Sequence, residues 1–177
     1  MEIRLHLINR YQSSFSIDGR ETSEKVVSLL HPARAFTQPL IRFTSKRSAR
    51  AFRSSAVEMI EIKSDPPPNW TMPPYLISIR MVSEKEYTQT MSEGSVHHDP
   101  DTDHEEAYTT GMLRLVMRSG WVVYLQVDSR ATSTRDLQKN LDRLLSAAAL
   151  QLFSGMEKNR VGLINLENVL AWKYSMP

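Results

Sequence analysis

The chain has no cysteine among its 177 residues, which excludes disulfides, thiolate metal sites and a cysteine nucleophile. No apolar run approaches the about 20 residues that cross a bilayer. The N-terminus alternates polar and apolar residues where an export signal would be continuously apolar. We therefore expect a cytoplasmic protein that does not contact a membrane.

Recognisable catalytic motifs are missing as well. Glycine occurs only six times and never in a cluster, so no glycine-rich loop is available to cradle a phosphate. The serines form no G-x-S-x-G elbow, and there is no H-E-x-x-H pair of metal ligands. The sequence predicts a protein that is not an enzyme, with no cofactor and no small-molecule substrate.

Charge divides the chain into three parts. The chain is 41% hydrophobic and 24% charged, as in ordinary globular proteins. The net charge is +4 over residues 1–66, −6 over 67–110 and +4 over 111–177. With the hydrophobic patterns below, this predicts a first unit at 1–64, a proline-rich and acidic connection at 65–110, and a second unit at 111–177.

The second unit has the clearer pattern. Met112–Arg118 alternates, Ser119-Gly120 is a turn dipeptide, and Trp121–Val127 is aromatic and β-branched, which predicts a β-hairpin. A helix is expected after Ser133, because leucines recur on one face at positions 137, 141, 144 and 145. Further strands are predicted at Leu150–Phe153 and Asn165–Tyr174, giving a ββαββ unit.

The first unit repeats this order about 110 residues earlier. Ile3–Leu5 falls on Leu113–Leu115 and Tyr11 on Trp121, and a shorter helix from Ser23 must end before Pro32. We predict an α+β fold of two repeated ββαββ units with mostly antiparallel sheets, packed as a pseudo-dimer. A chance likeness of two ordinary hairpin–helix–hairpin domains is the alternative.

The connection begins with prolines that favour an extended chain over residues 65–74. Residues 75–82 then alternate like one extra strand, and residues 84–110 lose the hydrophobic pattern, which predicts loop. Three histidines lie in this acidic part, and their side chains suit a divalent metal: His97, His98 and His104. A stable site needs a fixed scaffold, so we favour a solvated linker.

A basic cluster surrounds the third and fourth strands of the first unit. It consists of Arg42, Lys46, Arg47, Arg50 and Arg53, interleaved with Phe43 and Phe52. Cations that meet phosphates and rings that stack on bases are how single-stranded nucleic acids are often held. No RNP sequence, GXXG loop or zinc-finger spacing accompanies the cluster. Nucleic-acid binding is therefore the alternative function, beside the simpler interpretation of a solvated hairpin.

Large aromatic residues that could contact a partner suggest the leading function. Trp70 lies in the proline-rich segment, and Trp172 and Tyr174 lie in the last strand. Small sheets also leave edges that must be covered or paired. We expect a non-catalytic interaction component, structural, assembling or regulatory, that binds a protein partner or itself through sheet edges and faces.

Overall fold

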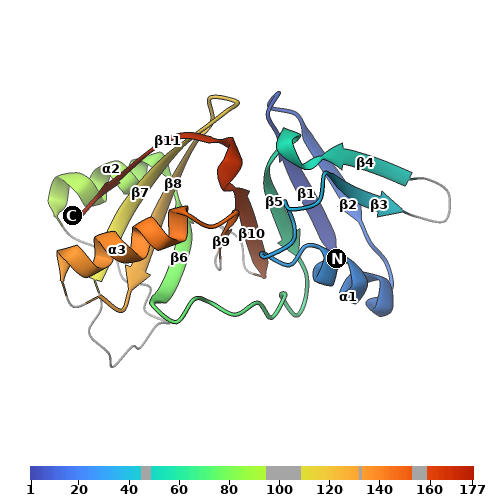
Figure 1. Ribbon diagram of the computed structural model, residues 1–177, viewed down its shortest axis with the longest axis horizontal. Helices are drawn as coiled ribbons and strands as arrows, with labels where there is room; N and C mark the ends of the chain where they lie inside the picture. The colour runs from blue at the N-terminus through green and yellow to red at the C-terminus, as the bar shows by residue number, and fades with distance from the viewer. Residues whose placement is uncertain (45–48, 95–108, 132, 153–158) are drawn as a thin grey trace.

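The computed structural model describes residues 1–44, 49–94, 109–131, 133–152 and 159–177. In these ranges the protein is α+β, with three α-helices and antiparallel sheets. Figure 1 shows two lobes, with strands β9 and β10 between them. None of the helices within the described ranges is long and apolar enough to cross a bilayer.

The elements of the first half are β1 (Glu2–Leu7), β2 (Gln12–Ser16), α1 (Arg20–Leu29), β3 (Leu40–Thr44), β4 (Ala49–Arg53), a 3₁₀ turn (Ser54–Ala56) and β5 (Val57–Lys63). The connection contributes β6 (Leu76–Val82) and α2 (Glu84–Glu93). The second half contains β7 (Thr109–Met117), β8 (Val122–Ser129), α3 (Thr134–Leu145), β9 (Ala149–Leu152), β10 (Arg160–Asn165), a 3₁₀ turn (Leu166–Asn168) and β11 (Val169–Ser175).

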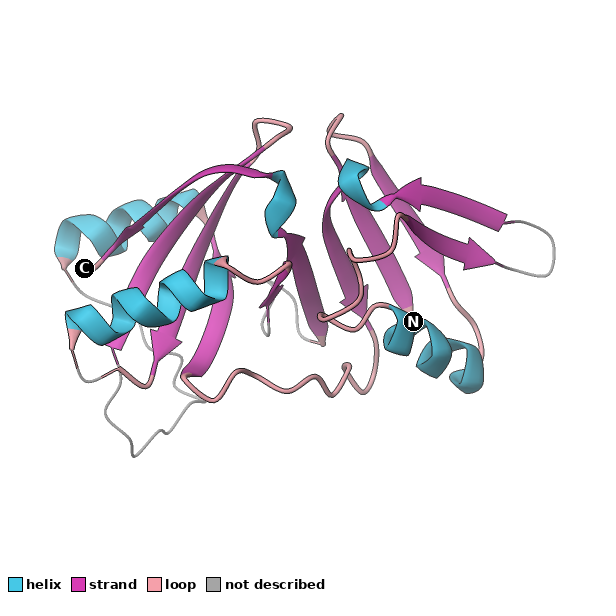
Figure 2. Ribbon diagram, in the orientation of Figure 1, coloured by secondary structure: helices cyan, strands magenta, loops and turns pink. Residues whose placement is uncertain are grey.

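A five-stranded sheet joins the two halves in the order β2-β1-β5-β10-β9. Strand β5 of the first half pairs antiparallel with β10 of the second, and Ile60 lies opposite Leu163. We call this pairing the central joint. The other strands form a four-stranded sheet, β11-β7-β8-β6, and a separate hairpin of β3 and β4 (Figure 2).

Helix α3 forms where the leucine stripe predicts it. The Ser133 hydroxyl accepts a hydrogen bond from the Asp136 backbone N–H, which caps the helix start. The helix buries three leucines in the same core as the strands β7 and β8: Leu137, Leu141 and Leu144. Helix α1 ends at Leu29, before Pro32, as the sequence predicts.

The two hydrophobic cores exchange residues across the central joint. Met59 of β5 packs in the core of the second half, with Leu115 and Leu137. Val161 and Leu163 of β10 pack in the core of the first half. Because each joint strand contributes to the opposite core, burial of apolar surface holds the two halves together.

Three predictions about elements differ from the structure. Asn165–Tyr174 is not one strand: β10 ends at Asn165, whose side chain accepts from the Glu167 N–H and turns the chain before β11. Within the described residues each half has five strands rather than four. Residues 84–93, predicted as loop, form α2, because Ser83 caps the helix by accepting from the Glu86 N–H and Gly94 ends it in the left-handed conformation. The extra strand at 75–82 is confirmed as β6.

Candidate interaction surfaces

The central joint is fixed by buried polar side chains as well as by strand pairing. The fully buried Asn165 amide donates to the carbonyls of Ser54 (3.1 Å) and Val57 (3.0 Å). The buried Glu58 carboxylate accepts from the backbone N–H of Ser119, 2.6 Å away in the β7–β8 turn. Charge-assisted bonds of this kind are stronger than neutral ones, so β5 is firmly attached to the second half.

A charged cluster lies on one face of the same strands. Glu61 of β5 accepts from Arg160 of β10 at 2.8 Å, with Arg4 at 3.5 Å and His6 at 3.4 Å. Burial raises the pKa of the Glu61 carboxyl, but the close contact with His6 and the positive charges of Arg160 and Arg4 outweigh it. The pKa of Glu61 therefore lies below its ordinary value of 4.5.

The lowered pKa of Glu61 predicts a pH-dependent stability term. A carboxyl whose pKa is depressed by folding stabilises the protein fully above its unfolded pKa, and loses that contribution as the pH falls through the folded value. We expect Glu61→Gln to be less stable than the parent at neutral pH, and this difference to shrink as the pH falls below 4.5. Urea titrations over a pH series measure it. The exposed carboxyl of Glu167 provides the control variant Glu167→Gln, and equal pH profiles for the two variants would contradict the prediction.

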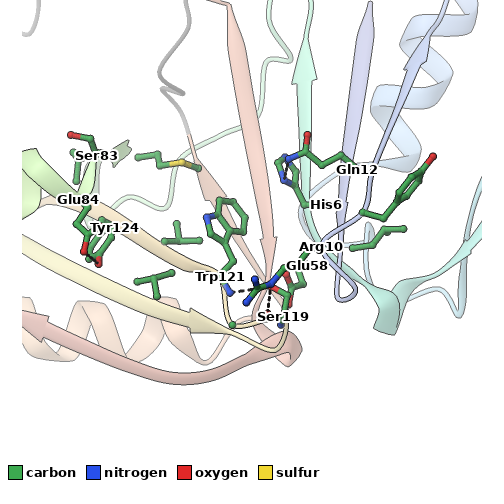
Figure 3. Close-up of a pocket in the computed structure, with 16 residues that line it drawn as sticks. His6, Arg10, Gln12, Glu58, Ser83, Glu84, Ser119, Trp121 and Tyr124 are labelled. Carbon is green, nitrogen blue, oxygen red and sulfur yellow. Dashed lines mark hydrogen bonds between the residues drawn. The ribbon is translucent and has the colours of Figure 1, made fainter.

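A cleft of about 730 Å³ opens beside the central joint, between β1–β2 and β8. His6 stacks on Trp121 with ring centroids 5.2 Å apart, and Arg10 donates to the Ser119 carbonyl at 2.9 Å. Figure 3 shows that the acidic side chains lie on two sides of the cleft: Glu58 at the β7–β8 turn, and Glu84 beside Tyr124. Glu58 accepts a hydrogen bond from the Ser119 N–H, and Glu84 accepts one from the Tyr124 hydroxyl. These polar groups therefore fix the walls of the cleft in place.

Strand β11 is an open sheet edge. It pairs with β7 on one side, and no strand among the described residues lies on its other side. The side chains of Leu170 and Trp172 are 64% and 46% exposed, and the Trp172 ring stacks on Tyr174 at 6.0 Å. Sequence reasoning found the two aromatic residues, and the structure adds Leu170 and places all three on an edge.

The described residues of the basic cluster lie on the β3–β4 hairpin. Arg42, Arg50 and Arg53 are exposed, where they can meet phosphates, and nucleic-acid binding stays a prediction. The rings of Phe43 and Phe52 instead pack around Phe15, with centroids 4.7 Å and 5.7 Å from it. These rings therefore contribute to the first core and offer little face for a base to stack on. Lys46 and Arg47 lie outside the described residues.

Two further predicted sites have different outcomes. Trp70, predicted to contact a partner, is only 7% exposed and packs in the first core, because the proline-rich segment runs back against that half. It leaves almost no surface for a partner. The three candidate metal ligands, His97, His98 and His104, lie outside the described residues. The open edge of β4 was missed, and the signal for it is the alternation of alanine and arginine in Ala49–Arg53, where Phe52 is the one large apolar side chain.

Comparison with known proteins gives no relative. No protein-family model matches the chain, and neither a curated protein nor a solved structure matches it.

Proposed function

We propose that this protein is a non-catalytic interaction component that binds another polypeptide along the open edge of β11. The observation that carries the proposal is the exposure of Leu170 and Trp172 on a seven-residue edge strand. An edge strand presents a row of unpaired backbone donors and acceptors that a second chain can pair with. Backbone pairing supplies affinity in this mode of recognition, and adjacent side chains supply specificity.

The other outer edges of the two larger sheets are less suited to this role. Apart from Phe15, which packs against the first core, strand β2 carries only serines and a glutamine, and polar, short edges are those that resist pairing. Strands β6 and β9 lie against each other. By contrast, β11 has one charged side chain, Lys173, among exposed apolar ones. Large exposed apolar side chains on an edge mark a surface that another molecule covers.

We further propose that the two halves are copies of one unit, related as a pseudo-dimer. Both halves run in the order strand, strand, helix, strand, strand, 3₁₀ turn, strand. The backbone agrees in detail: the Leu7 N–H donates to the Tyr11 carbonyl (2.9 Å), as the Met117 N–H does to the Trp121 carbonyl (2.8 Å). The pairing register of the last strand also shifts at corresponding places, at Glu58 in β5 and at Leu170 in β11. Two unrelated domains have no reason to share an irregularity.

Site-specific photocrosslinking tests the proposed function. Leu170 is replaced by benzoylphenylalanine in the full chain, and cells of the native host that make the variant are irradiated. We expect a covalent product of higher mass that contains a second polypeptide, because the exposed edge at Leu170 is occupied in the cell. Mass spectrometry of the product identifies that polypeptide.

Leu29 on helix α1 is the matched control position. It is also a leucine and is 66% exposed, but it lies on a helix, where no backbone edge is available. We expect little product from position 29. An absence of product at position 170, or equal yields at the two positions, would show that β11 is not a binding edge.

A further inference from the structure

We infer that the polypeptide on the β11 edge is strand β4 of a second copy of this chain, paired in the register that the central joint already uses. The inference rests on the proposed function and names its partner. Within one chain β5 pairs with β10. The corresponding strands of the opposite halves are β11 and β4, and both are open edges of the described structure.

The correspondence is read from the strand registers. A shift of 112 residues carries Val57 of β5 onto Val169 of β11, and Ala51 of β4 onto Leu163 of β10. The hairpins agree as well, because Ile41 pairs with Phe52 where Leu150 pairs with Ile164. The free side of β4 therefore corresponds to the side of β10 that meets β5. The free side of β11 corresponds to the side of β5 that meets β10.

The exposed apolar residues lie where this correspondence predicts an interface. Tyr11, which is 60% exposed, corresponds to Trp121, which stacks on His6 across the joint. Leu170 corresponds to Glu58, whose carboxylate accepts a hydrogen bond from Ser119 of the opposite half. Trp172 corresponds to Ile60, which is fully buried opposite Leu163. Five large apolar side chains are exposed in the described residues, and three of them correspond to residues that make contacts across the central joint.

Side-chain sizes fit the same register. Val161 and Leu163 of β10 face Ile62 and Ile60 of β5 in the central joint. The corresponding pairs place Ala49 of one copy opposite Tyr174 of the next, and Ala51 opposite Trp172. Both alanines are exposed. Two small side chains thus leave room for two large rings, and cross-strand pairs that fit in size are those that stabilise a sheet.

One pair in this register is unfavourable, and it supplies the test. Arg50 corresponds to Gly162 and Lys173 to Glu61, a pair in the central joint. In the joint between two copies Arg50 therefore faces Lys173, and like charges directly opposite each other weaken strand pairing. Reversing either charge turns this repulsion into attraction.

The assembly is open rather than a closed dimer. Strand β4 lies in the right-hand lobe and β11 in the left-hand lobe (Figure 1), and the two do not pair within the chain. A head-to-tail contact between different surfaces adds copies until a ring closes or a filament grows. The mass should therefore rise past that of a dimer with concentration.

Sedimentation equilibrium of the full chain and a double-mutant cycle test the inference. We expect wild-type protein to associate with concentration. Arg50→Glu and Lys173→Glu should each tighten the association roughly two- to tenfold, and the double variant should return to the wild-type affinity because two glutamates then face each other. Circular dichroism shows that each variant is folded.

Cysteine pairs verify the register, since the natural chain has no cysteine. A mixture of Arg50→Cys and Lys173→Cys chains should form a disulfide-linked pair on oxidation, and a mixture of Gln12→Cys on β2 and Lys173→Cys chains should not. A Lys173→Cys homodimer without the mixed product would identify β11 of the second copy as the occupant and overturn the inference.

Other outcomes separate this inference from the proposed function. If wild type and the single variants are monomeric at every soluble concentration, self-association through β4 is overturned. If position 170 then still crosslinks to a different protein, the proposed function stands alone. If Lys173→Glu alters association and Arg50→Glu does not, β4 is not the partner strand.

Discussion

Replacing Leu115 with alanine is expected to lower the free energy of unfolding by about 2–5 kcal/mol. Leu115 of β7 is fully buried in the second core, and Leu5 of β1 is fully buried in the first. Removing either side chain leaves a cavity that a close-packed interior fills only in part. Urea denaturation followed by circular dichroism measures the loss.

The more informative result is that both variants should unfold in one transition. Met59 and Leu163 each pack in the core of the opposite half, so neither core can open while the other stays intact. Trp70 reports the first core and Trp121 the second, so in each of two forms that keep only Trp70 or only Trp121 of the three tryptophans, fluorescence and circular dichroism should give the same midpoint. Leu29→Ala, at an exposed leucine, is the control and should change stability by less than about 0.5 kcal/mol. Two separate transitions would show that the halves are independent.

Asn165→Ala is expected to cost about 2–4 kcal/mol, because it removes the donor from buried carbonyls. Its amide donates to Ser54 and Val57, and its oxygen accepts from the Glu167 N–H at 3.2 Å. The Val57 carbonyl keeps a second donor, Asn168 at 2.9 Å, while the Ser54 carbonyl and the Glu167 N–H lose a partner. The change therefore weakens the turn between β10 and β11 together with the central joint.

Gln151 provides the comparison for that variant. It is a second buried amide, and its Nε2 has no hydrogen-bond partner among the described residues. Replacing a buried polar group that lacks a partner by an apolar one is close to neutral, so Gln151→Leu should change the free energy of unfolding by less than about 1 kcal/mol. Similar losses of unfolding free energy for the two variants in urea denaturation would mean that the hydrogen bonds of Asn165 do not stabilise the fold.

The sequence predicts elements that depend on local pattern. The leucine stripe of α3 and the alternating strands β7 and β8 lie where periodicity places them, because each has one face to bury. Strand β10 was missed because Val161–Ile164 is buried on both faces and shows no alternation. Its partner β5 lies about 100 residues earlier in the chain, and no local pattern indicates a pairing over that separation.

The candidate surfaces depend on the same long-range pairing. Trp172 is recognisable in the sequence as a large apolar residue on a strand, but only the sheet order shows that its strand is an edge. Trp70 lies in a proline-rich segment, which predicts exposure, yet it is buried because the chain after β5 returns along the first core. Exposure of an aromatic side chain is thus decided by tertiary packing rather than by its neighbours in the sequence.

Hydrogen exchange of the full chain over a concentration series tests the central claim most directly, which is that β11 and β4 are the open counterparts of the joint that β5 and β10 close. Backbone amides in paired strands exchange slowly and those on open edges exchange fast. We predict that β5 and β10 are protected at every concentration, and that β4 and β11 gain protection together as the concentration rises. Exchange in β4 and β11 that is independent of concentration would contradict the account.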